Sequence, residues 1–513
     1  MKPIRLISGF LTVGFWTLMS RVLGFAREIL ILGLIGPAGG MDAFVAAFRL
    51  PNMFRRFFAE GAFNAAFVPM FSKKYAADDN ATKFARDAFN GLAFVVLTLT
   101  ALAMIFMPAL VWATAEGFHG DDRFDVTVGY GRIMFPYILF MSLAALFSGV
   151  LNATGRFAVA AAAPVLLNIF AVAAMALAYA FGQEVITWLI WTIPIAGIAQ
   201  LALVWRAATR AGIKIRPGLP RWTPDMSQMV KVAVPAALAS GVMQINLVVG
   251  QLVASRTEGA VSWLFAADRL YQLPLGVIGI AVGIVLLPDL SRRLKSGDDA
   301  GARHAYSRAS EFALALTIPS AIALLVIPLP LVSVMYERGA MTPADTQAIA
   351  WATAIYGLGL PAFVLQKTLQ PLFFAREDTK SPFRYALWAM VINAALAFGL
   401  HPWIGWMAPA VATTAAGWIM VLQLALGARK FGDVTRFDTR FKSKLWRIIA
   451  AASVMGAALY WLAMTLSTAL TTAGLRYLAL AGLVFGGMAI YFAMAQLIGA
   501  INLKEFRRAG RSD

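Results

Sequence analysis

The sequence predicts an all-α polytopic membrane protein, and three properties of the chain support this prediction. Of its 513 residues, 60% are hydrophobic and only 14% are charged, which is a balance that soluble domains rarely have. The hydrophobic residues form runs that are long enough to cross a bilayer as helices. The basic residues gather in the short connections between those runs, as the positive-inside rule describes for membrane proteins.

Fourteen apolar runs are separated by charged and turn-forming residues, so we expect 14 transmembrane helices. The first run follows a basic start, as a signal peptide would. No small-residue cleavage pattern follows it, however, and the run continues past Arg21, so we interpret it as a membrane helix. The expected helices span residues 6–36, 41–72, 84–114, 126–152, 157–181, 185–209, 227–255, 259–292, 304–334, 344–374, 381–400, 404–428, 443–468 and 473–500.

The Lys and Arg residues predict the orientation of these helices. With 14 helices, 32 of the 44 basic residues fall on the side that holds both termini. Five others, Arg123, Arg132, Arg256, Arg338 and Arg476, fall on the opposite side. The side rich in basic residues is then cytoplasmic. The net charge of +18 therefore indicates orientation and contact with anionic lipid headgroups, and nucleic acid is not expected as a partner.

An internal duplication divides the chain. Six expected helices separate equivalent positions, so the two halves share one orientation and are related by an axis along the membrane normal, with a site at their interface. The expected domains are an N-terminal lobe of six helices (1–210), a pseudo-symmetric C-terminal lobe of six (211–430), and the last two helices with a basic tail (431–513). The matched positions are Pro69 with Pro288, Pro108 with Pro328, Glu116 with Glu337, Pro136 with Pro361 and Asn168 with Asn393.

The second expected helix has an unusual number of ionisable residues for a membrane segment. Such residues normally face a partner or a water-filled space inside the protein. Pro51 removes a backbone N–H and should kink this helix near its middle. We therefore predict that it lines a pathway. At 100° per residue, one stripe of the helix contains Asp42, Arg49, Asn52, Arg56 and Glu60, with Arg55 one step round.

The first expected helix adds Arg21, Arg27 and Glu28, with Gly24 leaving room for a close neighbour. These charges have a second interpretation, because Arg21 and Glu28 share a face and can pair, and Arg27 can reach the membrane interface by snorkelling. On the second helix, Asp42 can likewise pair with Arg49, and Arg56 with Glu60.

Pairing does not neutralise the region, because five arginines face three acids across the two helices. The planar guanidinium groups suit phosphate oxygens, so the pattern favours an anionic, phosphorylated ligand whose apolar part stays in lipid. In the second half, Asp268 and Arg269 add no net charge and can be a structural pair. Lys367, between Gln366 and Gln370, either lines the same space or snorkels.

The sequence does not favour an enzyme. It has no Cys and only three scattered His residues, so we expect no thiol nucleophile, metal site or histidine relay. It has no Gly-rich phosphate loop, nucleophile elbow or paired-carboxylate motif, so we expect neither catalytic residues nor a cofactor. No soluble stretch is long enough for a nucleotide-binding domain, which leaves an ion gradient, the membrane potential or substrate concentration as the source of energy.

Three stretches resemble a known family. They are SRVLGFARE at 20–28, DAFVAAFRLPNMFRRFFAEGAFNAAFVP at 42–69 and ADRLYQLPLGVIGIAVGIVLLP at 267–288, and they closely resemble the MurJ (MviN) family of bacterial lipid II flippases. That family belongs to the multidrug/oligosaccharidyl-lipid/polysaccharide exporter superfamily. The resemblance covers the whole chain and implies two six-helix lobes around a cationic cavity, with a groove for the lipid tail at the last two helices.

The resemblance also implies a function and a location. The protein is expected in the bacterial inner membrane, with both termini cytoplasmic. It is expected to move undecaprenyl-pyrophosphate-linked peptidoglycan precursor (lipid II) from the cytoplasmic to the periplasmic leaflet by alternating access. Expected partners are lipid II, membrane lipids and cell-wall synthesis proteins. By position, the family's essential charged residues fall on Arg21, Arg27, Asp42, Arg55, Arg56, Asp268 and Arg269.

The chain departs from the family at four places. Glu28 stands where Asp is common and Arg49 where Lys also occurs, and both changes keep the charge. Gln272 stands where some members have Glu, and the seventh expected helix has Gln244 and Asn246 but no acid, so sodium coupling is not supported. The alternatives are an exporter of another polyprenyl-linked glycan or of a drug, a membrane glycan polymerase and a non-transporting scaffold.

Overall fold

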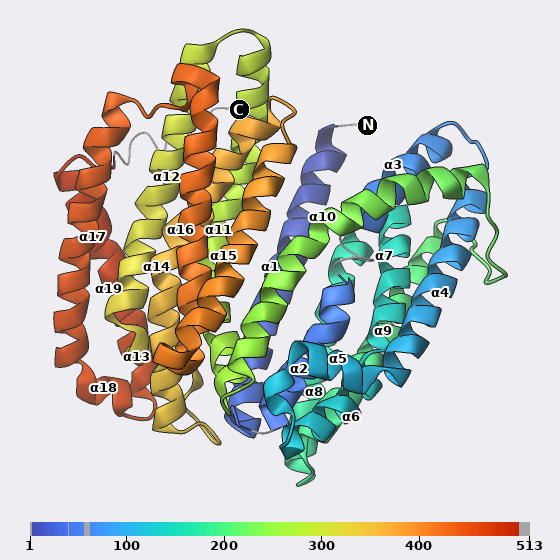
Figure 1. Cartoon of the computed structure of the whole chain (residues 1–513), viewed down its shortest axis with the longest axis horizontal. Helices are drawn as coiled ribbons and strands as arrows, with labels where there is room; N and C mark the ends of the chain where they lie inside the picture. The colour runs from blue at the N-terminus through green and yellow to red at the C-terminus, as the bar shows by residue number, and fades with distance from the viewer. Residues whose placement is uncertain (1–2, 39, 56–61, 502–513) are drawn as a thin grey trace. The chain divides into compact units, whose positions relative to one another are not determined.

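The computed structural model describes residues 3–38, 40–55 and 62–501, and Figure 1 shows how they fold. These residues form α-helices and short 3-10 helices joined by turns, and they contain no β-strand. Within the described residues, nine segments are long and apolar enough to cross a membrane. The predicted all-α class is therefore confirmed.

The chain forms two compact units, which we describe separately. The first comprises residues 1–262 together with 338–341. Its helices are α1 (Pro3–Ile35), α2 (Gly40–Arg55), α3 (Ala62–Ala76), α4 (Ala81–Ile105), α5 (Met107–Thr114), α6 (Asp122–Met134), α7 (Tyr137–Ala153), α8 (Phe157–Ala180), α9 (Val185–Arg210), α10 (Pro224–Ala254) and the first residues of α11 (Ala260–Lys295). The unit therefore includes α10, which the predicted duplication assigns to the second half; the boundaries of the predicted lobes stay a prediction.

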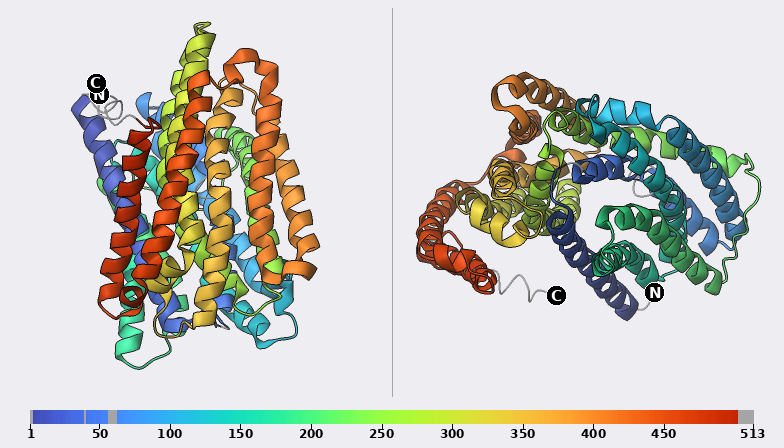
Figure 2. Two further views of the ribbon diagram at one scale, coloured as in Figure 1. Left: turned by 90° about the vertical axis from the view of Figure 1, so that its left-hand side faces the viewer. Right: turned by 90° about the horizontal axis from the view of Figure 1, so that it is seen from below.

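The second unit comprises residues 263–337 and 342–513. After the remainder of α11 it contains α12 (Asp299–Val326), α13 (Pro328–Tyr336), α14 (Pro343–Phe374), α15 (Lys380–Ile404), α16 (Ala408–Ala428), α17 (Thr439–Thr465), α18 (Ser467–Thr471) and α19 (Leu475–Leu497). The long helices of this unit run alongside one another (Figure 2), with α17 and α19 joined by α18.

Each expected membrane segment coincides with one helix or with two consecutive helices. The segments expected at 84–114, 126–152 and 304–334 are each divided, at Phe106, Phe135 and Ile327. A proline follows each break within two residues, and proline disfavours the helical conformation of the residue before it. Pro108 and Pro328, which the predicted duplication matches, both stand in the first turn of a short helix. The number of membrane crossings remains a prediction.

Aromatic side chains build the core of the first unit. Phe67 of α3 stacks on Phe63 and on Phe84 of α4, with ring centroids 5.3 Å and 5.6 Å apart. Phe147 of α7 stacks on Trp205 of α9 at 5.3 Å. Each of these phenylalanines is at most 6% exposed. Between membrane helices such contacts act through close van der Waals packing, and they join α3 to α4 and α7 to α9.

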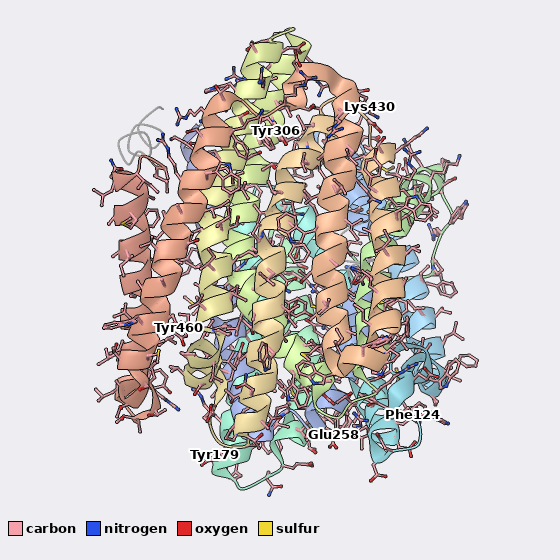
Figure 3. All side chains as sticks on the ribbon, turned by 60° about the vertical axis from the view of Figure 1, so that its left-hand side comes forward. Phe124, Tyr179, Glu258, Tyr306, Lys430 and Tyr460 are labelled. Carbon is pink, nitrogen blue, oxygen red and sulfur yellow. The ribbon has the colours of Figure 1, made fainter. Side chains whose placement is uncertain are left out.

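Polar contacts hold the connections at one end of the second unit, where Tyr306 and Lys430 lie in Figure 3. Lys430 donates a hydrogen bond of 2.7 Å to Asp378, in the turn between α14 and α15. This hydrogen bond, together with two from Ser381, lowers the pKa of Asp378 to about 2. Its carboxylate is therefore charged at physiological pH and ties the start of α15 to the connection after α16.

Candidate functional site

The charged residues of α1 do not pair as the spacing first suggests. Arg27 donates to the adjacent Glu28 with its Nη2 3.2 Å from the carboxylate, and both side chains are largely buried. Arg21 lies two turns earlier, is exposed, and forms no ion pair with a described residue. The Arg21–Glu28 pair is therefore not formed in this structure, and Arg21 is left as an available cation.

The close approach predicted at Gly24 is present. Asn168 of α8 is buried and donates a hydrogen bond of 3.0 Å to the carbonyl of Ser20 on α1. A Cβ atom on Gly24 would lie 3.6 Å from the amide of Asn168, which is ordinary contact distance. The Asn168 side chain therefore anchors the part of α1 that presents Arg21.

The arginines of α2 bond to nearby backbone and amide groups. Arg49 donates to the carbonyl of Leu247 on α10 at 3.2 Å. Arg55 donates to the Asn52 side chain at 3.3 Å. The helix continues through Pro51 to Arg55. Two predicted site residues, Arg56 and Glu60, lie outside the described residues.

Asp42 is fully buried at the start of α2 and binds the first turn of α11. Its carboxylate accepts hydrogen bonds from the backbone N–H of Gly259 (2.7 Å) and Ser262 (2.9 Å) and from the Ser262 hydroxyl (2.7 Å). Arg123 of α6 adds an ion pair at 3.4 Å. A carboxylate stabilises a helix N-terminus because the first N–H groups there have no partner within the helix. We call these four residues the Asp42 clasp.

The clasp gives Asp42 partners other than those suggested by the sequence. Its contacts are with Arg123, Gly259 and Ser262, and not with Arg49. In this structure the Asp42 carboxylate therefore joins the start of α2 to the start of α11 and does not line an open space. Its role in substrate binding remains a prediction. Sequence reasoning missed Ser262 and treated Arg123 only as a marker of orientation, because no local signal links residues more than 80 positions apart.

A second set of contacts reinforces the same end of the first unit, where Figure 3 shows Phe124 and Glu258. The backbone N–H of Gly117 donates to the buried hydroxyl of Ser255 at 3.0 Å. Arg256 pairs with Glu116 at 3.3 Å. The connection between α10 and α11 is thus held on one side by the Asp42 clasp and on the other by residues 116–117.

Gly117 cannot gain a side chain without moving backbone. A Cβ atom there would lie 2.5 Å from the Arg256 nitrogen and 2.6 Å from the Ser255 carbonyl carbon. We expect Gly117→Ala to destabilise the protein by about 1–3 kcal/mol, measured as a lower thermal unfolding midpoint. The control is Gly129→Ala on α6, where a Cβ atom would meet nothing within 4 Å and the helix should become no less stable. Equal midpoints for the two variants would contradict this close contact.

In the second unit, the predicted site residues lie on α11. Asp268 accepts a hydrogen bond from Gln272, one turn along the helix. The guanidinium of Arg269 lies 4.7 Å from the centre of the Phe265 ring, as in a cation–π contact. Gln272, which departs from the family, thus neighbours the acid of the predicted pair. Lys367 on α14 is exposed.

The sequence predicts no metal site. Among the described residues, no group of three or more His, Asp or Glu side chains is arranged to hold a metal ion.

Comparisons with known proteins agree with this architecture. The family model described as "Lipid II flippase MurJ" matches residues 33–479. A probable lipid II flippase MurJ of Rhizobium tropici is 44% identical over 98% of this chain and 96% of its own length. A solved MurJ structure in an inward closed conformation superposes with a TM-score of 0.79 at 25% identity, over 95% of this chain and 98% of that one.

The fold is shared more widely. An inward-facing multidrug resistance MATE transporter of the MOP superfamily superposes with a TM-score of 0.68 at 12% identity, covering 82% of this chain and 97% of that one; at that identity the likeness concerns the fold alone. The family model and the near full-length identity decide the assignment. This multi-pass membrane protein belongs to the MurJ family of lipid II flippases.

Proposed function

We propose that this protein is a lipid II flippase, which moves the lipid-linked peptidoglycan precursor from the cytoplasmic to the periplasmic leaflet of the bacterial inner membrane. The observation that supports this most strongly is the 44% identity to a probable lipid II flippase over 98% of the chain. The asymmetry of Lys and Arg along the sequence supports cytoplasmic termini. We propose a transporter without an enzymatic step.

In the proposed mechanism, arginines hold the pyrophosphate of the substrate. Arg21 is exposed and forms no ion pair with a described residue, so it can bind phosphate oxygens without first breaking an ion pair. Arg27 must instead exchange its contact with Glu28 (3.2 Å) for one with the substrate. Such an exchange suits transport, because a carrier that bound its substrate equally tightly in every state would not release it.

The other predicted residues complete this proposal. We assign Arg269 to the same headgroup and Arg49, Arg55 and Arg56 to its support. Glu60 and Asp268 would balance the arginines when the substrate leaves, and Asp42 would do so in a state in which the Asp42 clasp is open. The planar guanidinium groups of Arg49 and Arg55 suit phosphate oxygens, which supports these assignments.

We assign α17 and α19 to the lipid tail. Both helices expose large apolar side chains, including Trp461 and Phe485, which are 70% and 69% exposed. Close packing at Gly487, whose Cβ atom would lie 2.8 Å from Leu459, brings the two helices together. A pair of adjacent helices with exposed aromatic residues suits a long polyprenyl chain, which needs apolar contact and no specific hydrogen bonds.

The experiment is depletion of the protein in its native cell, followed by measurement of the leaflet that lipid II occupies. We expect lipid II to accumulate on the cytoplasmic face and the wild-type gene to reverse this. Unchanged sidedness, with any other translocase shown to be inactive, would contradict the proposal and favour an exporter of another polyprenyl-linked glycan.

A further inference from the structure

A polar pocket lies at one end of the first unit, and none of the predicted transport residues is among those that line it. Its volume is about 540 Å³, within the range of roughly 300–1,000 Å³ that is typical of small-molecule sites. It is formed by the end of α3, the start of α4 and the connection between α9 and α10. The lining residues are Tyr75, Asp78, Asn80, Ala81, Thr82, Lys83, Arg86 and Lys214.

The pocket has an excess of positive charge. Lys83, Arg86 and Lys214 line it, and none of them forms an ion pair with a described residue. Two nearby acids are already paired, since Lys74 lies 3.4 Å from Asp79 and 3.1 Å from Asp225. Asp78 is the one acid among the lining residues. Three cations against one carboxylate in a concave site favour an anionic ligand.

Hydrogen-bond donors in the pocket match a phosphate group. Arg86 offers a planar guanidinium and Tyr75 a hydroxyl, both of which suit phosphate oxygens. The Asn80 side chain does not cap α4, so the N–H groups of Ala81 and Thr82, which have no acceptor among the described residues, are available. The N-terminus of this 25-residue helix adds a favourable electrostatic field for an anion.

The segment around Lys214 is held in place, and the residues after it have the composition of a membrane interface. Ile213 and Ile215 are buried, and the backbone N–H of Gly218 donates to Asn90 of α4 at 2.9 Å. Farther along, Leu219 and Trp222 are 85% and 75% exposed. Exposed tryptophan beside basic residues is typical of the interface between lipid headgroups and hydrocarbon.

The position of α4 also supports a location at headgroup level. The helix is a candidate membrane span, and Phe94 and Leu97 near its middle are both 57% exposed, as lipid-facing residues are. The pocket lies at its N-terminal end, on the side that the basic residues predict to be cytoplasmic. We propose that this pocket binds a phosphate group, supplied by the headgroup of an anionic phospholipid of the cytoplasmic leaflet.

The test compares two variants of the purified full-length protein that remove the same charge. The triple variant Lys83→Ala, Arg86→Ala, Lys214→Ala acts on the pocket. The control removes three exposed basic residues of the same unit that lie outside it, namely Arg206, Arg210 and Lys231. One arm measures how much phosphatidylglycerol each protein retains from bilayers that mix phosphatidylglycerol with phosphatidylcholine. The other titrates inorganic phosphate into lipid-free protein in detergent.

We expect the pocket variant to bind phosphatidylglycerol at least about tenfold more weakly than wild type and control, because it loses the three cations that can form charge-assisted hydrogen bonds with the phosphate oxygens. Asp78→Asn should bind it more tightly, which separates a binding defect from misfolding. Binding of phosphate without retention of the lipid would support the phosphate site and assign it to a soluble ligand. Equal binding by pocket variant and control in both arms would overturn the proposal.

Discussion

Replacing Arg21 by alanine is expected to slow lipid II transport by about one to two orders of magnitude, which is loss of function in a cell that depends on this protein. A hydrogen bond to a charged group contributes about 1.5–3 kcal/mol, and the loss of that free energy corresponds to this change in rate. Arg21 is exposed on α1 and pairs with no described acid, so its removal leaves no buried charge behind. Protein level and thermal stability should therefore remain at their wild-type values.

The measurement is complementation of the depleted strain, together with transport of labelled lipid II in reconstituted vesicles. Arg21→Lys should give an intermediate rate, because it keeps the charge but loses the planar fork that binds two phosphate oxygens. Arg269→Ala is expected to abolish function in the same way, and exposed Arg210→Ala is the control with normal activity. Full activity of Arg21→Ala would remove this residue from the binding site.

Replacing Asp42 by alanine is expected to have the largest effect on stability, about 3–5 kcal/mol, because it leaves buried partners without their acceptor. The N–H groups of Gly259 and Ser262 and the Ser262 hydroxyl lose their acceptor, while the guanidinium of Arg123, whose side chain is 12% exposed, loses Asp42 and keeps Asp121. Asp42→Asn should cost less, because one carbonyl oxygen still accepts a hydrogen bond. The thermal unfolding midpoint of the purified protein measures both.

Asp121→Ala is the matched control for this experiment. Asp121 also pairs with Arg123, at 2.6 Å, and caps α6 by accepting from the backbone N–H of Arg123, but its side chain is 42% exposed, so its loss should cost about 0.5–2 kcal/mol. An Asp42→Ala protein that kept its stability and lost only transport would favour the sequence-based interpretation, in which Asp42 contributes to the substrate cavity. A large loss of stability would instead assign Asp42 to the clasp.

The sequence by itself determined the fold class and the positions of the helices. In a bilayer, each backbone N–H and C=O must find a partner within its own segment, so an apolar run of sufficient length forms a helix. That constraint is local, and it explains why the predicted segment 157–181 agrees with α8 (Phe157–Ala180) and 185–209 with α9 (Val185–Arg210). The breaks at Phe106 and Phe135 can also be predicted from the sequence, because a proline follows each.

Only the tertiary structure decided which charges meet. Asp42 accepts a hydrogen bond from Ser262, 220 positions away, and Lys214 lines the same pocket as Lys83. Within one helix, spacing suggested that Arg21 pairs with Glu28, and the structure instead pairs Arg27 with Glu28. Periodicity fixes the face of a helix on which a residue lies. The partner across a loop or another helix depends on how those elements pack, and no local pattern in the sequence encodes that arrangement.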